Sequence, residues 1–74
     1  MPYVNIQITK EGGENGQGIS AAQKANLIKG VTELLQREIH KDPATTHVVI
    51  SEVELANWGV GGLPVEAYRQ ALKG

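Results

Sequence analysis

Pro2 is the residue of this sequence best suited to acid–base chemistry. If the initiator Met1 is removed, Pro2 carries a free secondary amine on a rigid ring at the start of an alternating segment. An α-amino group titrates near pH 8, and lowering its pKa by about one unit costs about 1.4 kcal/mol, which partial burial can supply. The result is a general base near neutral pH. Acylated by Met1, the same nitrogen is an amide and cannot act as a base.

The other side chains with chemical potential are few, and each also has an ordinary structural interpretation. Pro2 itself suits the first position of a strand. Lys10 is typical of a solvated strand end, His47 of a strand residue facing solvent or a neighbour, and Trp58 of a packing residue. With no cysteine, and with His40 and His47 lacking carboxylates at ligand spacing, we expect no metal site.

Two glycine-rich stretches, residues 13–18 and 59–62, resemble neither of the common nucleotide-binding loops. The first lacks the lysine of a P-loop, and the second lacks the strand and long helix that flank a dinucleotide-binding turn. We interpret both stretches as turns.

The length allows one domain, residues 1–74, with a small core. Hydrophobic residues make up 41% of the chain, but Phe is absent. A single core of fewer than about 70 to 80 residues seldom supplies more than about 5 kcal/mol, and small domains therefore use disulfides, metals or oligomerisation. Since the first two are not expected here, self-association is the predicted source of extra burial.

The charge pattern excludes some function classes. Seven basic and eight acidic residues give a net charge of −1 without a run of like charges, which argues against a nucleic-acid partner. No apolar stretch approaches the roughly 20 residues that span a bilayer, and Asn5 and Gln7 interrupt the apolar run that a signal peptide needs. We therefore expect a protein of the cytoplasm that binds no membrane.

The periodicity of the chain predicts a β-α-β unit of the α+β class. Alternation over residues 3–9 indicates a strand with one buried face. Ser20 and Gln23 form a capping-box signature at the start of a helix whose last turn contains His40 and Lys41. Residues 45–53 are rich in β-branched side chains, as in a second strand. A strand, a long helix and a strand predict parallel pairing and a right-handed connection.

The C-terminal part predicts smaller elements. Residues 55–62 read as a turn and a very short extended piece, a strand or half of a hairpin, which we expect to pair across a subunit boundary. Pro64 is suited to the first turn of a short final helix. Because the long helix covers only one face of the sheet, another subunit is expected to cover the other face.

Taken together, these features resemble the 4-oxalocrotonate tautomerase family. The resemblance rests on Met1-Pro2 before an alternating strand, on a helix that opens with Ser-x-x-Gln-Lys at residues 20–24, and on the segments Val-Val-Ile-Ser-Glu at 48–52 and Asn-Trp-Gly-Val-Gly-Gly at 57–62. It covers nearly the whole chain in the same order. Each motif is weak alone, but their combination in a chain of this length is specific.

The resemblance implies a function and an assembly. It implies a cofactor-free isomerase in which Pro2 moves a proton between the carbon and oxygen of a 2-hydroxydienoate or a related enol acid. Trp58 stands where the family usually has an aromatic wall of the site, and Val60 matches a nearby apolar wall position. The implied assembly is a homohexamer, with a dimer as the alternative, and its active sites lie at subunit boundaries.

Two departures from the family pattern concern the substrate. The prototypes carry an arginine after a Glu-Gly at the end of the first strand and another in the second strand; here Gly13 and His47 occupy those positions. Lys10 and His47 can supply only weaker, non-bidentate contacts, and His47 only when protonated. A monoacid or a neutral enone is therefore a more plausible substrate than a dicarboxylate.

Three functional hypotheses remain. The first is the tautomerase, with Pro2 as acid–base and Lys10, His47, Trp58 and Val60 as substrate-binding residues. The second is a non-catalytic oligomeric scaffold or small-molecule-binding protein of the same fold. The third keeps the enzyme but has the proline amine add to a carbonyl or hydrate an activated alkene.

Overall fold

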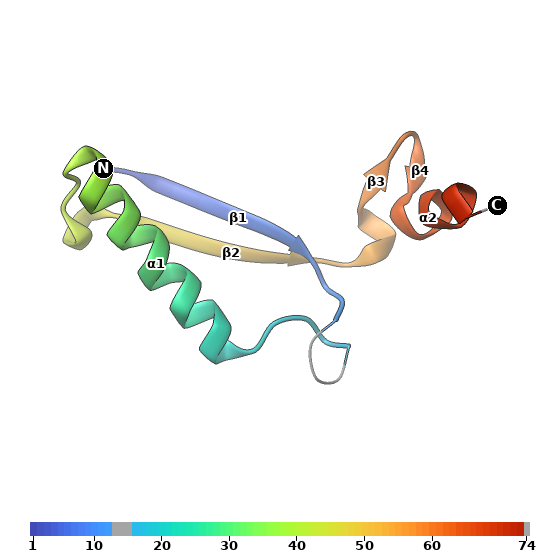
Figure 1. Cartoon of the computed structure of the whole chain (residues 1–74), viewed down its shortest axis with the longest axis horizontal. Coiled ribbons are helices and arrows are strands. Elements are labelled where there is room, and N and C mark those ends of the chain that lie inside the picture. The colour runs from blue at the N-terminus through green and yellow to red at the C-terminus, as the bar shows by residue number, and fades with distance from the viewer. Residues whose placement is uncertain (13–15, 74) are drawn as a thin grey trace.

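A parallel pair of strands and one long helix form the body of the molecule. The computed structural model describes residues 1–12 and 16–73. Figure 1 shows the elements in chain order: β1 (Tyr3–Thr9), α1 (Ala21–Ile39), η1 (Pro43–Thr45), β2 (His47–Val53), η2 (Leu55–Asn57), β3 (Gly59–Val60), β4 (Leu63–Pro64) and α2 (Val65–Lys73). The predicted β-α-β unit, with its short hairpin and final helix, is confirmed.

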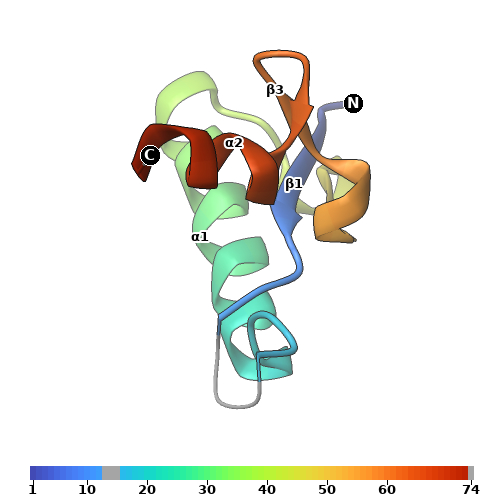
Figure 2. The ribbon, with the colours of Figure 1, turned by 90° about the vertical axis from the view of Figure 1, so that its right-hand side faces the viewer.

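The sheet buries one face only. β1 and β2 pair in parallel from Tyr3 opposite His47 to Thr9 opposite Val53. Alternate residues on one side are half-buried and face α1, which lies beside that face (Figure 2): Val4, Ile6 and Ile8 from β1, and Val48, Ile50 and Glu52 from β2. This alternation follows from the two-residue period of a strand. The opposite face remains uncovered in the single chain.

The start of α1 is fixed by the predicted capping box. The Ser20 hydroxyl accepts a hydrogen bond from the amide of Gln23 at 3.1 Å, and the Gln23 side chain accepts one from the amide of Ser20 at 2.8 Å. The helix ends at Ile39, earlier than predicted, because His40 adopts a left-handed conformation with φ 56°. Its amide then closes the helix through the carbonyl of Gln36 at 3.0 Å.

The starts of the second strand and of the final helix were predicted wrongly. The second strand begins at His47 rather than residue 45, because Asp42 caps a short turn over Pro43–Thr45. The short extended piece pairs within the chain, where β3 and β4 form an antiparallel hairpin, and its pairing across a subunit boundary stays a prediction. As a result Pro64 ends β4, and α2 begins one residue later, at Val65.

The single chain is elongated and has almost no enclosed core. Among the described residues only Val65 is buried, at 7% exposure, and the accessible surface is 5449 Å². A compact monomer of this 7.9 kDa mass would expose about 4400 Å². The radius of gyration is 15.8 Å, whereas a compact domain of 74 residues has about 11 Å. Across residues 1–12 and 16–73, no helix is both long and apolar enough to cross a bilayer.

Candidate active site

Pro2 and His47 meet at the first rung of the sheet. The carbonyl oxygen of Pro2 accepts a hydrogen bond from the His47 amide at 2.9 Å, and Pro2 is half-buried. Met1, by contrast, is 87% exposed. Because the backbone ladder holds Pro2 on its carbonyl side, its ring nitrogen has a fixed place at the end of β1. The structure thus brings together two of the predicted site residues.

The uncovered sheet face begins at the same end. Tyr3, Asn5 and His47 lie on it and are exposed. The Asn5 side-chain amide donates to the hydroxyls of Tyr3 at 3.3 Å and Ser51 at 3.2 Å, which links the two strands across this face. Any surface that covers this face would also close one side of the Pro2 end.

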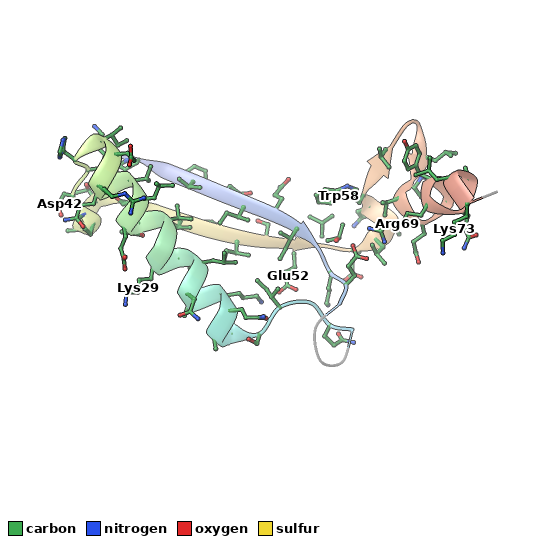
Figure 3. All side chains as sticks on the ribbon, in the orientation of Figure 1. Lys29, Asp42, Glu52, Trp58, Arg69 and Lys73 are labelled. Carbon is green, nitrogen blue, oxygen red and sulfur yellow. The ribbon has the colours of Figure 1, made fainter. Side chains whose placement is uncertain are left out.

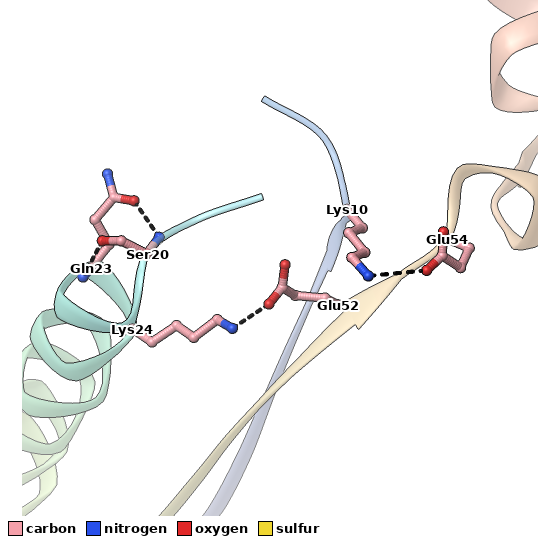
Figure 4. Close-up of polar contacts among 6 residues, drawn as sticks. All are labelled: Lys10, Ser20, Gln23, Lys24, Glu52 and Glu54. Atoms are coloured by element: carbon pink, nitrogen blue, oxygen red, sulfur yellow. Dashed lines mark hydrogen bonds and ion pairs between the residues drawn. The ribbon is translucent and has the colours of Figure 1, made fainter. Parts of the chain in front are cut away.

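Lys10 lies at the other end of the strand. Its amide donates to the carbonyl of Val53 at 2.8 Å, and its ammonium group lies 3.4 Å from a carboxylate oxygen of Glu54 (Figure 4). Eight residues of extended chain separate it from Pro2, a span of about 26 Å. In one protomer, Lys10 and Pro2 therefore cannot contact the same small substrate.

Trp58 and Val60 belong to a separate part of the chain, the C-terminal arm, which we define as residues 55–73. Trp58 is half-buried, and its carbonyl accepts a hydrogen bond from the Val65 amide at 2.8 Å. Val60 lies in the hairpin and is 36% exposed. Figure 3 places Trp58 beyond the end of the sheet that is far from Asp42 and the chain start. The predicted site residues therefore form two groups, one at each end of the protomer.

The arm is joined to the end of β1 by an ion pair that the sequence interpretation missed. The Arg69 guanidinium donates to both carboxylate oxygens of Glu11, at 2.8 and 3.0 Å, and Thr9 also donates to this carboxylate. The hydrogen bonds from Arg69, then the one from Thr9, lower the pKa of Glu11 to about 2, and the same contact raises the pKa of Arg69. No local sequence pattern predicts an ion pair between Glu11 and Arg69, which lie 58 residues apart in the chain.

A second ion pair fastens α1 to the sheet. Lys24 of α1 contacts the carboxylate of Glu52, whose Oε2 atom is enclosed and has no hydrogen-bond partner within residues 1–12 and 16–73 (Figure 4). Gly18 lies against this carboxylate with φ 94°, and a Cβ atom there would come within 2.2 Å of Oε2. Glycine suits both the backbone conformation and the space, whereas a residue with a Cβ atom would have to displace the end of the Glu52 side chain.

Among the described residues there is no cluster of side chains that would bind a metal ion. Among them there is also no pair of free arginines that would bind an anion. No three His, Asp or Glu side chains of residues 1–12 and 16–73 gather as metal ligands. Gly13, at one expected arginine position, lies outside the described residues. His47 occupies the other, and Arg69 is committed to Glu11. Of the predicted site residues, the structure places the backbones of Pro2 and His47 in contact, and the acid–base role of Pro2 stays a prediction.

Comparison with known proteins gives consistent matches over almost the whole chain. A family model described as tautomerase enzyme matches residues 2–68. "Probable tautomerase K2" of Dickeya dadantii (strain 3937) is 53% identical over 70 residues, which cover 95% of this chain and 96% of that protein.

Solved structures show the same fold. The crystal structure of DmpI from Helicobacter pylori superposes with a TM-score of 0.80 at 38% identity, covering 93% of this chain and 97% of that one. A heterohexamer 4-oxalocrotonate tautomerase from Chloroflexus aurantiacus J-10-fl gives a TM-score of 0.71 at 24% identity, covering 89% and 95% respectively. At that lower identity the likeness concerns the fold alone.

Proposed function

This chain belongs to the tautomerase family, and from that premise we propose that it is a cofactor-free keto–enol tautomerase whose general acid–base is Pro2, freed by removal of Met1. The observation that carries the proposal is the anchoring of Pro2 at the sheet end, where the His47 amide holds its carbonyl at 2.9 Å. A base fixed in this way loses little further freedom when a substrate binds.

The proposed reaction moves one proton and needs no redox partner. The Pro2 nitrogen accepts the proton of the enol hydroxyl while the carbonyl double bond forms. The π electrons of the carbon–carbon double bond shift onto the carbon that is to be protonated. The resulting ammonium then returns a proton to that carbon, which completes the ketone and regenerates the free amine. Efficient transfer requires a pKa for the amine near the working pH, below the value of about 8 of a free α-amino group.

We further propose that each active site is built from two subunits. Within one chain the Pro2–His47 end and the Lys10–Trp58–Val60 end lie about 26 Å apart along the strand. An assembly that brings the arm of one protomer to the Pro2 of another would unite them, and Trp58 would then exclude water from the amine. The excess accessible surface of the single chain, about 1000 Å², is close to the 800 Å² that a standard interface buries on each partner.

The assembly we favour is a homohexamer, with a dimer as the alternative. The similar protein from Chloroflexus aurantiacus is a heterohexamer, which supports association of this fold into assemblies of six chains. An assembly of identical chains in which the exposed sheet face forms an interface would also remove that face from solvent.

The preferred substrate is an enol acid with a single carboxylate. A dicarboxylate is best held by bidentate arginines. The arginine of the arm, Arg69, is already paired with Glu11. His47 is exposed beside Pro2, and Lys10 forms an ion pair with Glu54. These side chains provide point contacts suited to one carboxylate.

An enol assay on protein of known mass tests the proposal. Protein that begins at Pro2 is expected to ketonise phenylenolpyruvate. Pro2→Ala is expected to lower kcat/KM by about 100-fold, because the primary amine of alanine is no longer held in place by the proline ring. Protein that retains Met1 is expected to be as inactive as this variant. If the processed protein ketonises neither phenylenolpyruvate nor 2-hydroxymuconate, and Pro2→Ala changes nothing, the scaffold interpretation replaces the enzyme.

A further inference from the structure

The C-terminal arm is attached to the rest of the chain by few contacts. Its elements η2, β3, β4 and α2 pack on one another, and among the described residues none of them packs extensively on β1, β2 or α1. Figure 1 shows the arm extending beyond the end of the sheet. Without a further connection, only the chain segment between β2 and η2 would determine its orientation.

The Glu11–Arg69 pair supplies that connection. Both guanidinium nitrogens contact the carboxylate, at 2.8 and 3.0 Å, and this fork geometry fixes direction as well as distance. Thr9 donates to the same carboxylate and so orients Glu11 from the end of β1. The other charged group that acts on Arg69 is Glu66, on the same helix.

The contact is transmitted to Trp58 through α2. Arg69 follows Val65 by one helical turn, so the two residues lie on the same side of α2. Val65 is the buried residue of the arm, and its amide donates to the carbonyl of Trp58 at 2.8 Å. An interaction that fixes the position of Arg69 therefore also restrains the backbone of Trp58.

We propose that Glu11 and Arg69 are positioning residues for the active site, which orient the arm so that Trp58 reaches the Pro2 amine of a neighbouring subunit. This inference rests on the proposed function, because it assigns the pair a role in the same site. The pair does not touch the substrate. Its loss is expected to let Trp58 move and water reach the amine, which would raise the pKa of Pro2 toward that of a free α-amino group.

The test combines kinetics with the fluorescence of Trp58, which is the single tryptophan of the chain. In Arg69→Gln and Glu11→Gln, the acidic limb of the kcat/KM profile for phenylenolpyruvate is expected to shift upward by about one pH unit, with a loss of about tenfold at pH 6 that recovers at pH 9. Acrylamide is expected to quench Trp58 more strongly in both variants. Arg69→Lys should recover part of the activity, and the exchange of Glu11→Arg with Arg69→Glu should recover most of it.

Arg37→Gln is the matched control, because among the described residues the ion-pair partner of Arg37 is the adjacent Glu38, at 3.3 Å on the exposed surface of α1. It is expected to change neither the pH profile nor the quenching. If Arg69→Gln and Glu11→Gln also change neither, the positioning role is wrong. If the native protein is inactive, the proposed function alone is wrong. Unchanged acrylamide quenching in Arg69→Gln and Glu11→Gln would still show that this pair does not orient Trp58. Should one variant not fold, the other decides.

Discussion

At the residue scale, Glu11 makes the ion pair with Arg69 insensitive to pH over the range in which an enzyme works. The hydrogen bonds from Arg69 and Thr9 lower the pKa of Glu11 from 4.5 to about 2 in the folded chain. Since the folded value lies below the unfolded one, the stabilisation is complete above about pH 4.5 and is lost as the pH falls through 2. The pair therefore persists at every pH at which a proline amine titrates.

Thermal unfolding as a function of pH tests this assignment. Glu11→Gln is expected to lower the thermal midpoint by about 2 to 4 °C above pH 5, and the difference from the native protein should close as the pH falls toward 2. Glu33→Gln is the control, since Glu33 contacts Lys29 at 4.0 Å on an exposed helix face and should make little difference at any pH. A difference between Glu11→Gln and the native protein that persists at pH 2 would contradict the assignment.

Gly18 is the second residue whose identity the structure explains. Its φ of 94° strains any residue with a Cβ atom, and that atom would meet the Glu52 carboxylate at 2.2 Å. Gly18→Ala is expected to destabilise the protein by about 2 to 3 kcal/mol, through backbone strain and displacement of the Lys24–Glu52 contact. Gly16→Ala separates the two causes, because Gly16 has φ 67° but no atom of the described residues lies within 4 Å of a Cβ atom there, and the substitution should cost only about 1 kcal/mol. Urea unfolding at one protein concentration measures both, and equal losses would exclude the steric contribution.

At the scale of the elements, the start of α1 depends on two reciprocal hydrogen bonds. Ser20→Ala removes the acceptor of the Gln23 amide and is expected to cost about 1 kcal/mol. Gln23→Ala removes only the return bond to the Ser20 amide, which solvent can replace, and should cost less. Urea denaturation followed by circular dichroism measures the two losses. A larger loss of stability in Gln23→Ala than in Ser20→Ala would show that the hydrogen bond from the Ser20 amide to the Gln23 side chain fixes the helix start.

Elements specified by local signals were predictable, and those fixed by distant contacts were not. Alternation placed β1 at residues 3–9, and the Ser20–Gln23 spacing placed the start of α1. The C-terminal arm was harder, because β3 and β4 are two residues each and their pairing depends on the positive φ angles of Gly61 and Gly62. In the candidate site, Pro2 was proposed from its type and place and His47 from the family resemblance, and both roles stay predictions. The Glu11–Arg69 pair had no such signal, because it depends on a fold that joins residues 58 positions apart.

At the scale of the whole molecule, the surface of the chain suits a subunit better than a monomer. The exposed apolar side chains are spread over the open sheet face, α1 and the arm, and include Tyr3 at 64% and Ile39 at 51% exposure. Val65 is the buried residue among those described, which leaves too little core to offset the entropy of folding. We therefore expect folding and association to be coupled, so that the thermal midpoint rises with protein concentration.

If subunits share active sites, two defective proteins should complement each other. Pro2→Ala replaces the ring-held secondary amine with a flexible primary amine, and Trp58→Ala removes the wall. In a mixed assembly some sites would therefore combine an intact Pro2 with an intact Trp58 from different chains. With random mixing after joint unfolding and refolding, about one site in four is complete, and the mixture should approach a quarter of the native rate. Sites contained in single chains would instead give only half the activity of Trp58→Ala. The comparison of these two rates, with light scattering to verify assembly, decides whether the ends of the protomer meet across a subunit boundary.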